Sequence, residues 1–191
     1  MPVLVLGLVV FLGVHSVRLV AEDWRSRRVA AGGEKRWKRL FTVVSLVGLV
    51  LTIWGYSMAR QEPVLLWAPP VWTRHAASLL VLLGFILISA AHAPPNHFRA
   101  SLHHPMYAGT VLWAIGHLLA NGMLADLLLF GSILVWALAG FLTWRARDRA
   151  SGRSFPAGTA RGTIGAIVVG TVLWAVFAFL LHGPLIGVRP F

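Results

Sequence analysis

Six apolar runs divide the chain, and charged or proline-rich segments separate them. A helix needs about 20 apolar residues to cross a bilayer core of about 30 Å, so the pattern predicts six transmembrane spans. They cover residues 2–21, 40–59, 75–93, 106–121, 124–144 and 162–182. In lipid, the polar backbone groups of each span must be satisfied within that span. We therefore expect an all-α, polytopic transmembrane helical bundle that forms a single domain over residues 1–191.

Three connecting segments have compositions that predict their structure. Residues 18–39 are strongly basic with a Gly32-Gly33 break, which is typical of a loop lying against anionic lipid headgroups. Residues 61–74 contain three prolines, so we expect this segment to be non-helical and to lie flat as a lid over the bundle. Residues 148–158 have the composition of a linker, and we expect little fixed structure there.

The fourth run carries most of the polar chemistry found within the spans. At about 100° per residue, several of its residues fall within an arc of roughly 80° on one helix face. They are His103, Tyr107, Thr110, Ala114, His117 and Asn121. An ionisable side chain in hydrocarbon costs roughly 2.5–3.5 kcal/mol even by the lowest estimates, so it indicates a ligand, a proton path or a polar partner.

Composition and charge indicate a membrane protein and its orientation. The chain is 58% hydrophobic with a mean hydropathy of +0.76, and the lipid bilayer is its expected partner. The net charge of +11 lies in the loops between spans, so no nucleic-acid partner is expected. Fourteen of the 17 Lys and Arg residues lie in alternate loops. The positive-inside rule places those loops in the cytoplasm and both termini outside it.

The sequence contains no cysteine, which limits the available ligand chemistry. Metal or haem must bind through His, Met, Tyr or carboxylate, and covalent haem attachment through a Cys-x-x-Cys-His motif is excluded. His15 and His117 lie deep in their spans, and two facing imidazoles can hold a six-coordinate haem iron. At a rise of 1.5 Å per residue their levels differ by about 10 Å. Core histidines that bond to backbone, Ser or Thr are the alternative interpretation.

The remaining candidate residues surround these two histidines in the sequence. We expect Tyr107, Thr110 and Asn121 to line the pocket, and His104 and His75 to support the ligands or handle protons. One of His103 and His104 caps the fourth helix, and the sequence leaves open which. The other histidines lie near the ends of spans, where we expect water at the membrane interface to hydrate them without a functional role. They are His92, His97 and His182.

Several segments carry a family resemblance. They are Leu12 to Arg18, Trp54-Gly55-Tyr56, Arg74-His75, His104-Pro105-Met106, Leu112 to Gly122 and Leu185 to Val188. Together they resemble the NnrU family of bacterial inner-membrane proteins, from end to end of the chain. The resemblance implies an inner-membrane location, with periplasmic termini given the charge pattern. It also implies a role in nitrite and nitric oxide metabolism, with a respiratory or denitrification membrane complex as partner.

A plant branch of this family, the zeta-carotene isomerase, is similar across the same spans. It isomerises a polyene with haem b held by histidines, and by position its ligands fall on His15 and His117. The resemblance therefore implies haem b as cofactor and a hydrophobic or small-molecule substrate. The implied enzyme class is a haem-dependent isomerase or oxidoreductase. Ala114 stands where the plant branch has a cysteine, so ligand switching through that thiolate is not available here.

Two other functions remain open. The stretch from His104 to Gly109 is similar to the His-Pro-x-Tyr-x-Gly stretch of membrane methyltransferases that use S-adenosylmethionine. Those enzymes follow it with a paired glutamate, whereas residues 145–149 here read Arg-Ala-Arg-Asp-Arg. The third interpretation is a non-catalytic assembly factor for a membrane respiratory complex, in which the histidines only pack and hydrogen-bond.

Overall fold

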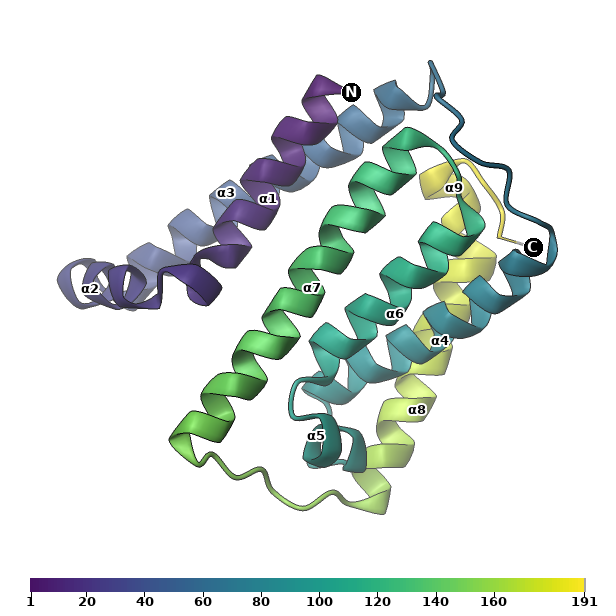
Figure 1. Cartoon of the computed structure of the whole chain (residues 1–191). Coiled ribbons are helices and arrows are strands. Elements are labelled where there is room, and N and C mark those ends of the chain that lie inside the picture. The colour runs from purple at the N-terminus through teal and green to yellow at the C-terminus, as the bar shows by residue number, and fades with distance from the viewer. Residues whose placement is uncertain (191) are drawn as a thin grey trace. The chain divides into compact units, whose positions relative to one another are not determined.

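Helices make up most of residues 1–190, the part of the chain that the computed structural model describes (Figure 1). Within that range the only β-type pairing is an isolated bridge between Leu65 and Met123. The all-α prediction is confirmed. The chain forms two compact units: unit 1 comprises Met1–Trp67 and Met123–Ser132, and unit 2 comprises Ala68–Gly122 and the described residues from Ile133 onward. The prediction of a single domain stays a prediction.

Close helix packing holds unit 1 together. Helices α1 (Pro2–Val20) and α3 (Glu34–Ala59) run antiparallel, because Leu4 meets Gly55 and Phe11 meets Gly48. A Cβ built on Gly48 would lie 2.6 Å from the backbone nitrogen of Phe11, so only glycine allows this approach. Small residues at such contacts let the backbones of membrane helices pack by van der Waals contact.

The basic segment between α1 and α3 is helical. It forms α2 (Glu22–Gly32), and Gly33 separates it from α3 with a φ of +80°. The rings of Trp24 and Trp37 meet edge-on at 5.8 Å, which joins α2 to the start of α3. The prediction of a loop over residues 18–39 is therefore wrong, because Glu22–Gly32 and the residues from Glu34 onward are helical. Only Gly33 breaks the two helices, and Gly32 ends the first of them.

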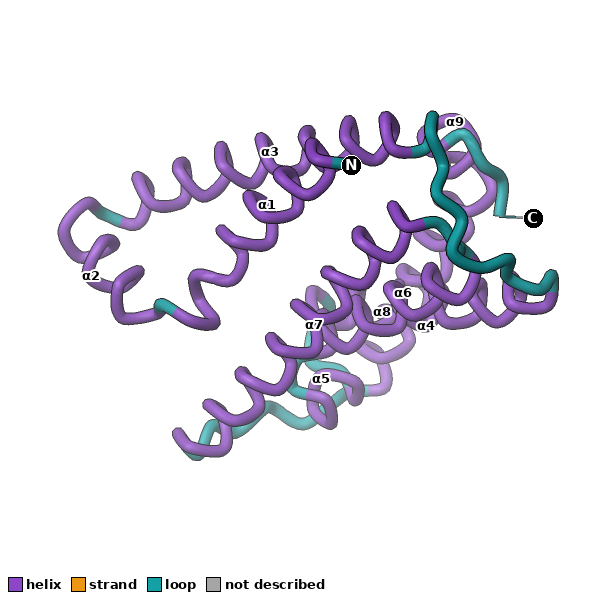
Figure 2. The backbone as a smooth tube through the Cα atoms, turned by 45° about the horizontal axis from the view of Figure 1, so that its top comes forward, coloured by secondary structure: helices purple, strands orange, loops and turns teal. Residues whose placement is uncertain are grey.

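The proline-rich segment that follows α3 is non-helical up to residue 71, as predicted (Figure 2). Within unit 1, the backbone nitrogen of Leu124 donates to the carbonyl oxygen of Val64 at 2.8 Å, beside the bridge between Leu65 and Met123. This pairing fixes the segment against the start of the helix that begins at Leu124. That the segment lies as a lid over the bundle stays a prediction.

Unit 2 is built around α4 (Trp72–His92), which packs against both α6 (Pro105–Ala120) and α8 (Ala160–Ala175) (Figure 1). Gly84 of α4 and Gly109 of α6 pack backbone to backbone, since a Cβ on Gly109 would lie 2.6 Å from the carbonyl oxygen of Gly84. The short helix α5 (His97–Leu102) connects α4 to α6. After α8 the chain continues through a π-helical turn, η1 (Val176–Leu181), into α9 (His182–Ile186).

Helix α7 (Leu124–Ser151) contributes its first residues to unit 1 and the rest to unit 2. It extends seven residues past the predicted end of its span at residue 144. The prediction that residues 148–158 have little fixed structure is therefore wrong at its start, where Asp148 is helical and only 5% exposed. The helix ends where Gly152 adopts a φ of +62°.

Five helical segments are long and apolar enough to cross a membrane. They are Pro2–Val20, Glu34–Ala59, Trp72–His92, Leu124–Ser151 and Ala160–Ile186. The protein is therefore an integral membrane protein. The remaining expected span corresponds to α6, which has 16 residues and is shorter than a usual spanning helix. The count of six spans stays a prediction.

Candidate functional site

His15 lies on α1 in unit 1, with its ring between aromatic side chains. Its Nδ1 lies 2.6 Å from the carbonyl oxygen of Phe11, one turn earlier. The ring centroid is 4.3 Å from that of Phe11 and 5.0 Å from that of Phe41 on α3. Because a carbonyl oxygen can only accept, Nδ1 carries the hydrogen, and in the neutral ring the lone pair belongs to Nε2.

His117 has the same local geometry in unit 2. Its Nδ1 lies 2.9 Å from the carbonyl oxygen of Trp113, and the two ring centroids are 4.5 Å apart. Asn121, which follows the last residue of α6, donates from Nδ2 to the carbonyl oxygen of His117 at 2.8 Å. Both deep histidines therefore bond through Nδ1 to the backbone carbonyl one turn earlier.

The expected pocket residues on α6 divide between its two ends. His104 and His117 are separated by about 20 Å along the helix at 1.5 Å per residue. Asn121 lies at the His117 end, and so does His75, because Ala77 of α4 packs against Gly116. The His75 side chain is exposed. His75 and Asn121 are thus brought near the level of His117 within unit 2, whereas His104 is not.

Tyr107 and Thr110 lie nearer the other end of α6. The hydroxyl of Tyr107 accepts a hydrogen bond from Nε1 of Trp144 at 3.2 Å, and its ring lies 5.2 Å from that of Trp136. Gly140 of α7 leaves space for the tyrosine ring, which a Cβ there would overlap. Thr110 bonds to the carbonyl oxygen of Met106 at 2.9 Å, a bond within its own helix.

His104 and Asp148 form a short polar contact between a partly buried imidazole and a buried carboxylate in unit 2. Nε2 of His104 lies 2.5 Å from Oδ2 of Asp148, and the side chains are 15% and 5% exposed. Arg153 lies 3.8 Å from the second oxygen of Asp148. The carboxylate accepts the hydrogen on Nε2 and so fixes the orientation of the imidazole. A histidine oriented by a carboxylate is a common arrangement for moving protons.

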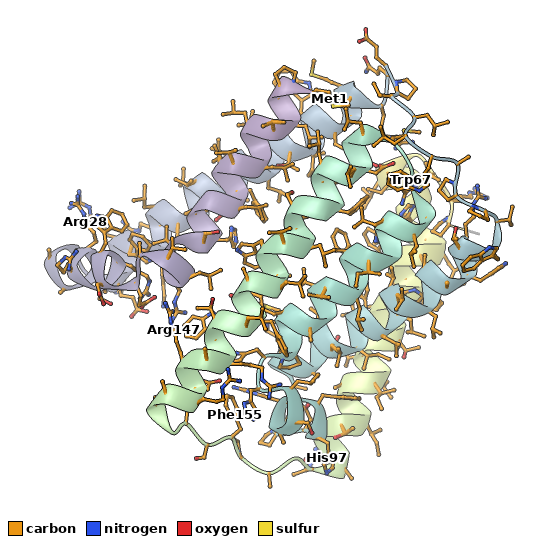
Figure 3. The ribbon with its side chains drawn as sticks, in the orientation of Figure 1. Met1, Arg28, Trp67, His97, Arg147 and Phe155 are labelled. Atoms are coloured by element: carbon orange, nitrogen blue, oxygen red, sulfur yellow. The ribbon has the colours of Figure 1, made fainter. Side chains whose placement is uncertain are left out.

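The structure separates the roles of the two neighbouring histidines. His104 occupies the position that caps α6, although its side chain makes no capping hydrogen bond and pairs with Asp148 instead. His103 has a φ of +65° and stacks on Phe155, with centroids 4.2 Å apart and planes at 12°. Figure 3 shows Phe155, Arg147 and His97 at this same end of unit 2.

A cavity of about 210 Å³ opens beside this pair. It is lined by Ala91, His92, Arg99, His103, His104, Pro105, Met106 and Tyr107. Basic side chains therefore dominate its polar groups. Asn96, which is fully buried, orders the turn between α4 and α5. Its side chain accepts a hydrogen bond from the backbone nitrogen of Arg99 and donates to the carbonyl oxygens of Ala90 and Pro94.

A second buried carboxylate lies in unit 1, and sequence reasoning missed it. Asp126 is 2% exposed and accepts a 2.6 Å hydrogen bond from the hydroxyl of Tyr56. Its other oxygen accepts from the backbone nitrogen of Met123 at 3.0 Å, which caps the start of α7. The signal was a single aspartate near the start of an otherwise apolar run, which is rare in membrane helices.

The described residues, 1 to 190, hold no group of three or more His, Cys, Asp and Glu side chains arranged to bind a metal ion. The candidate ligands are therefore single imidazoles and the His104–Asp148 pair. A porphyrin supplies four nitrogen ligands itself, so a haem iron requires only one or two from the protein. His15 and His117 each supply an imidazole, which is a ligand type that haem iron accepts.

Comparison with known proteins identifies a family. No curated protein and no solved structure matches the chain. A family model described as NnrU protein matches residues 3–190, which is nearly the whole chain. The match includes both deep histidines, the His104–Asp148 pair and the Tyr56–Asp126 bond. This membrane protein therefore belongs to the NnrU family.

Proposed function

We propose that this protein binds haem b, with His15 and His117 as the protein ligands of the iron. The observation that supports it is the shared geometry of these two rings. Each lies in an apolar helix, and each donates from Nδ1 to the carbonyl oxygen one turn earlier. Histidine ligands usually make this bond, because it fixes the ring and raises the basicity of Nε2. The proposal rests on the ligand chemistry of each histidine within its own unit.

The aromatic surroundings of the two rings also support the proposal. Phe11 and Phe41 flank His15, and Trp113 flanks His117. An apolar shell excludes water and controls the redox potential of a bound iron. A haem held by His15 and His117 would supply one-electron redox chemistry at that place.

The chain's own residues would hold and move protons apart from the haem. We propose that His104 exchanges a proton at Nδ1, while Asp148 fixes the ring through Nε2. His75 is an exposed imidazole near the level of His117 and is proposed as a second proton-handling group. These roles leave the iron ligands unchanged.

For the activity at this iron we propose nitrite or nitric oxide metabolism, in the bacterial inner membrane and with periplasmic termini. Redox-dependent isomerisation of a polyene is the second candidate for the same iron. Titration of the purified protein with nitric oxide and with a polyene distinguishes them. We expect the compound that acts at the site to change the haem spectrum when it is added at up to one equivalent per haem. The other compound should leave the spectrum unchanged.

Histidine variants test the ligand assignment. His15→Gln and His117→Gln keep a polar side chain but remove the imidazole. We expect each to lower haem content per chain, measured as the pyridine haemochrome, by at least about fivefold. His182→Gln is a matched control, because His182 also bonds to a backbone carbonyl through Nδ1, at 2.6 Å, and lies edge-on to Phe177. The proposal is wrong if all three variants keep wild-type haem content.

The alternatives give different outcomes in the same preparations. A non-catalytic assembly factor retains full cellular function in both ligand variants. If the protein is a methyltransferase, calorimetry should detect binding of S-adenosylmethionine, and Tyr107→Phe should abolish that binding. The cavity beside His104 and Tyr107, at about 210 Å³, is smaller than the range of about 300–1,000 Å³ typical of ligand pockets.

A further inference from the structure

A second hollow in unit 2 lies between α4 and α8 and plays no part in the haem proposal. It has a volume of about 830 Å³. Small residues of α8, among them Gly165 and Ala166, hollow out its wall, and Ile88, Val169 and Leu173 give it an apolar lining. Both helices are segments that can cross the membrane. The groove therefore has the volume and the apolar lining to take a hydrocarbon chain.

The groove adjoins the smaller basic cavity at one end. His92, the last residue of α4, lines both hollows. Arg161 and Thr159 lie at the edge of the groove, and Arg99 lines the cavity. An apolar channel thus leads to a cluster of basic side chains, which is the pattern of an amphipathic ligand with an anionic head.

The charges of this region lack an internal complement. Asp148 is the only acidic residue among the described residues of unit 2, and it is already engaged with His104 and Arg153. Among residues 1–190, neither Arg99 nor Arg161 forms an ion pair. Basic pockets between membrane helices bind the headgroups of anionic lipids. The negative charge that complements Arg99 and Arg161 must therefore come from outside the described residues, and a phosphate headgroup has that charge.

We propose that this composite hollow is a binding site for an anionic phospholipid. One acyl chain occupies the groove between α4 and α8, and the phosphate lies beside His92, Arg99 and Arg161. The position agrees with the charge pattern, which places this end of the helices at the cytoplasmic leaflet. The site is independent of His15 and His117.

Lipid binding to the purified full-length protein in mixed micelles tests the proposal. Native mass spectrometry and equilibrium titration compare phosphatidylglycerol with phosphatidylcholine, which has a similar shape and no net charge. We expect selective binding of phosphatidylglycerol. The double variant Arg99→Gln, Arg161→Gln should weaken that binding roughly thirtyfold, because each basic side chain near an anionic lipid contributes about fivefold.

Three further measurements separate the site from general attraction of charge. Arg149→Gln removes an exposed charge that lines neither hollow, and we expect phosphatidylglycerol binding to stay within about twofold of wild type. Gly165→Leu fills the groove where a Cβ meets no atom within 4 Å, and we expect loss of lipid binding in a folded protein. Inorganic phosphate should not compete, because the acyl chain supplies part of the binding.

If the glutamine variant does not fold, the charge-retaining double variant Arg99→Lys, Arg161→Lys replaces it in the test. We expect this lysine variant to retain most of the preference for phosphatidylglycerol. Equal binding of the two lipids by wild type would overturn the proposal. Wild-type selectivity in the folded glutamine variant would also overturn it. Competition by inorganic phosphate at concentrations similar to those of the lipid would overturn it too, because it would mean that the site binds free phosphate.

Discussion

The His104–Asp148 pair allows a quantitative prediction about unit 2. Asp148→Asn keeps the size of the side chain and removes its charge, so it creates no cavity. The carboxylate is 5% exposed and lies 2.5 Å from Nε2 of His104. A hydrogen bond to a charged group contributes about 1.5–3 kcal/mol, and breaking a fully buried pair costs about 3–5 kcal/mol. Because His104 retains 15% exposure, we expect a loss of about 2 kcal/mol in the free energy of unfolding.

A double-mutant cycle isolates this contact. His104→Gln and the double variant complete the cycle, and unfolding in mixed micelles is followed by far-UV circular dichroism. We expect a coupling energy of at least about 1 kcal/mol, since the two side chains touch. Arg153→Gln is the control, because Arg153 lies 3.8 Å from Asp148 and is 55% exposed. Its loss should cost under about 0.5 kcal/mol.

Two results would show that His104 and Asp148 do not stabilise unit 2 as a pair. Additive effects of the two single variants, within about 0.5 kcal/mol, would mean that the pair does not contribute as a unit. A loss in Arg153→Gln equal to that in Asp148→Asn would mean that the exposed arginine, and not the buried imidazole, is the main partner of the carboxylate.

The remaining predictions concern unit 1 and the topology. Gly48→Val places a side chain against the Phe11 backbone and should cost at least about 1–3 kcal/mol in unfolding free energy, whereas Gly13→Ala, with no atom within 4 Å, should be neutral. Tyr56→Phe removes the hydrogen bond to buried Asp126 and should cost about 1–3 kcal/mol by the same assay; an unchanged value would mean that Asp126 depends on the helix cap alone. Alkaline phosphatase fused to either terminus should be active if α6 crosses the membrane; activity at the N-terminus alone would mean five spans.

The sequence could predict the helices because their cause is local. A run of apolar residues long enough for the bilayer gives a helix whatever the neighbours are, and α1, α3, α4, α7 and the α8 segment follow that rule. The predicted end of this span, residue 144, comes seven residues before the observed end of α7 at Ser151, and the reason is physical. Residues 145–149 are rich in arginine, which resembles a solvated linker, yet arginine favours helices and no glycine intervenes before Gly152.

The candidate site could be predicted only in part. The deep positions of His15 and His117 follow from the apolar runs around them. The partners of the buried polar groups do not, because His104 and Asp148 are 44 residues apart and Tyr56 and Asp126 are 70 apart. Such pairs depend on how helices pack. Helical periodicity gives the face on which a residue lies but not its height along the axis. It therefore assigns Tyr107 and His117 to one pocket although they lie about 15 Å apart along the helix.

Whether this protein binds haem is decided by the visible absorption spectrum of the purified protein, taken from cells supplied with a haem precursor. We expect a Soret band and the sharp α and β bands of reduced low-spin haem b, with one haem per chain, held by His15 and His117. A well-folded preparation with no Soret band, even after haem is added, would mean that the protein does not bind haem.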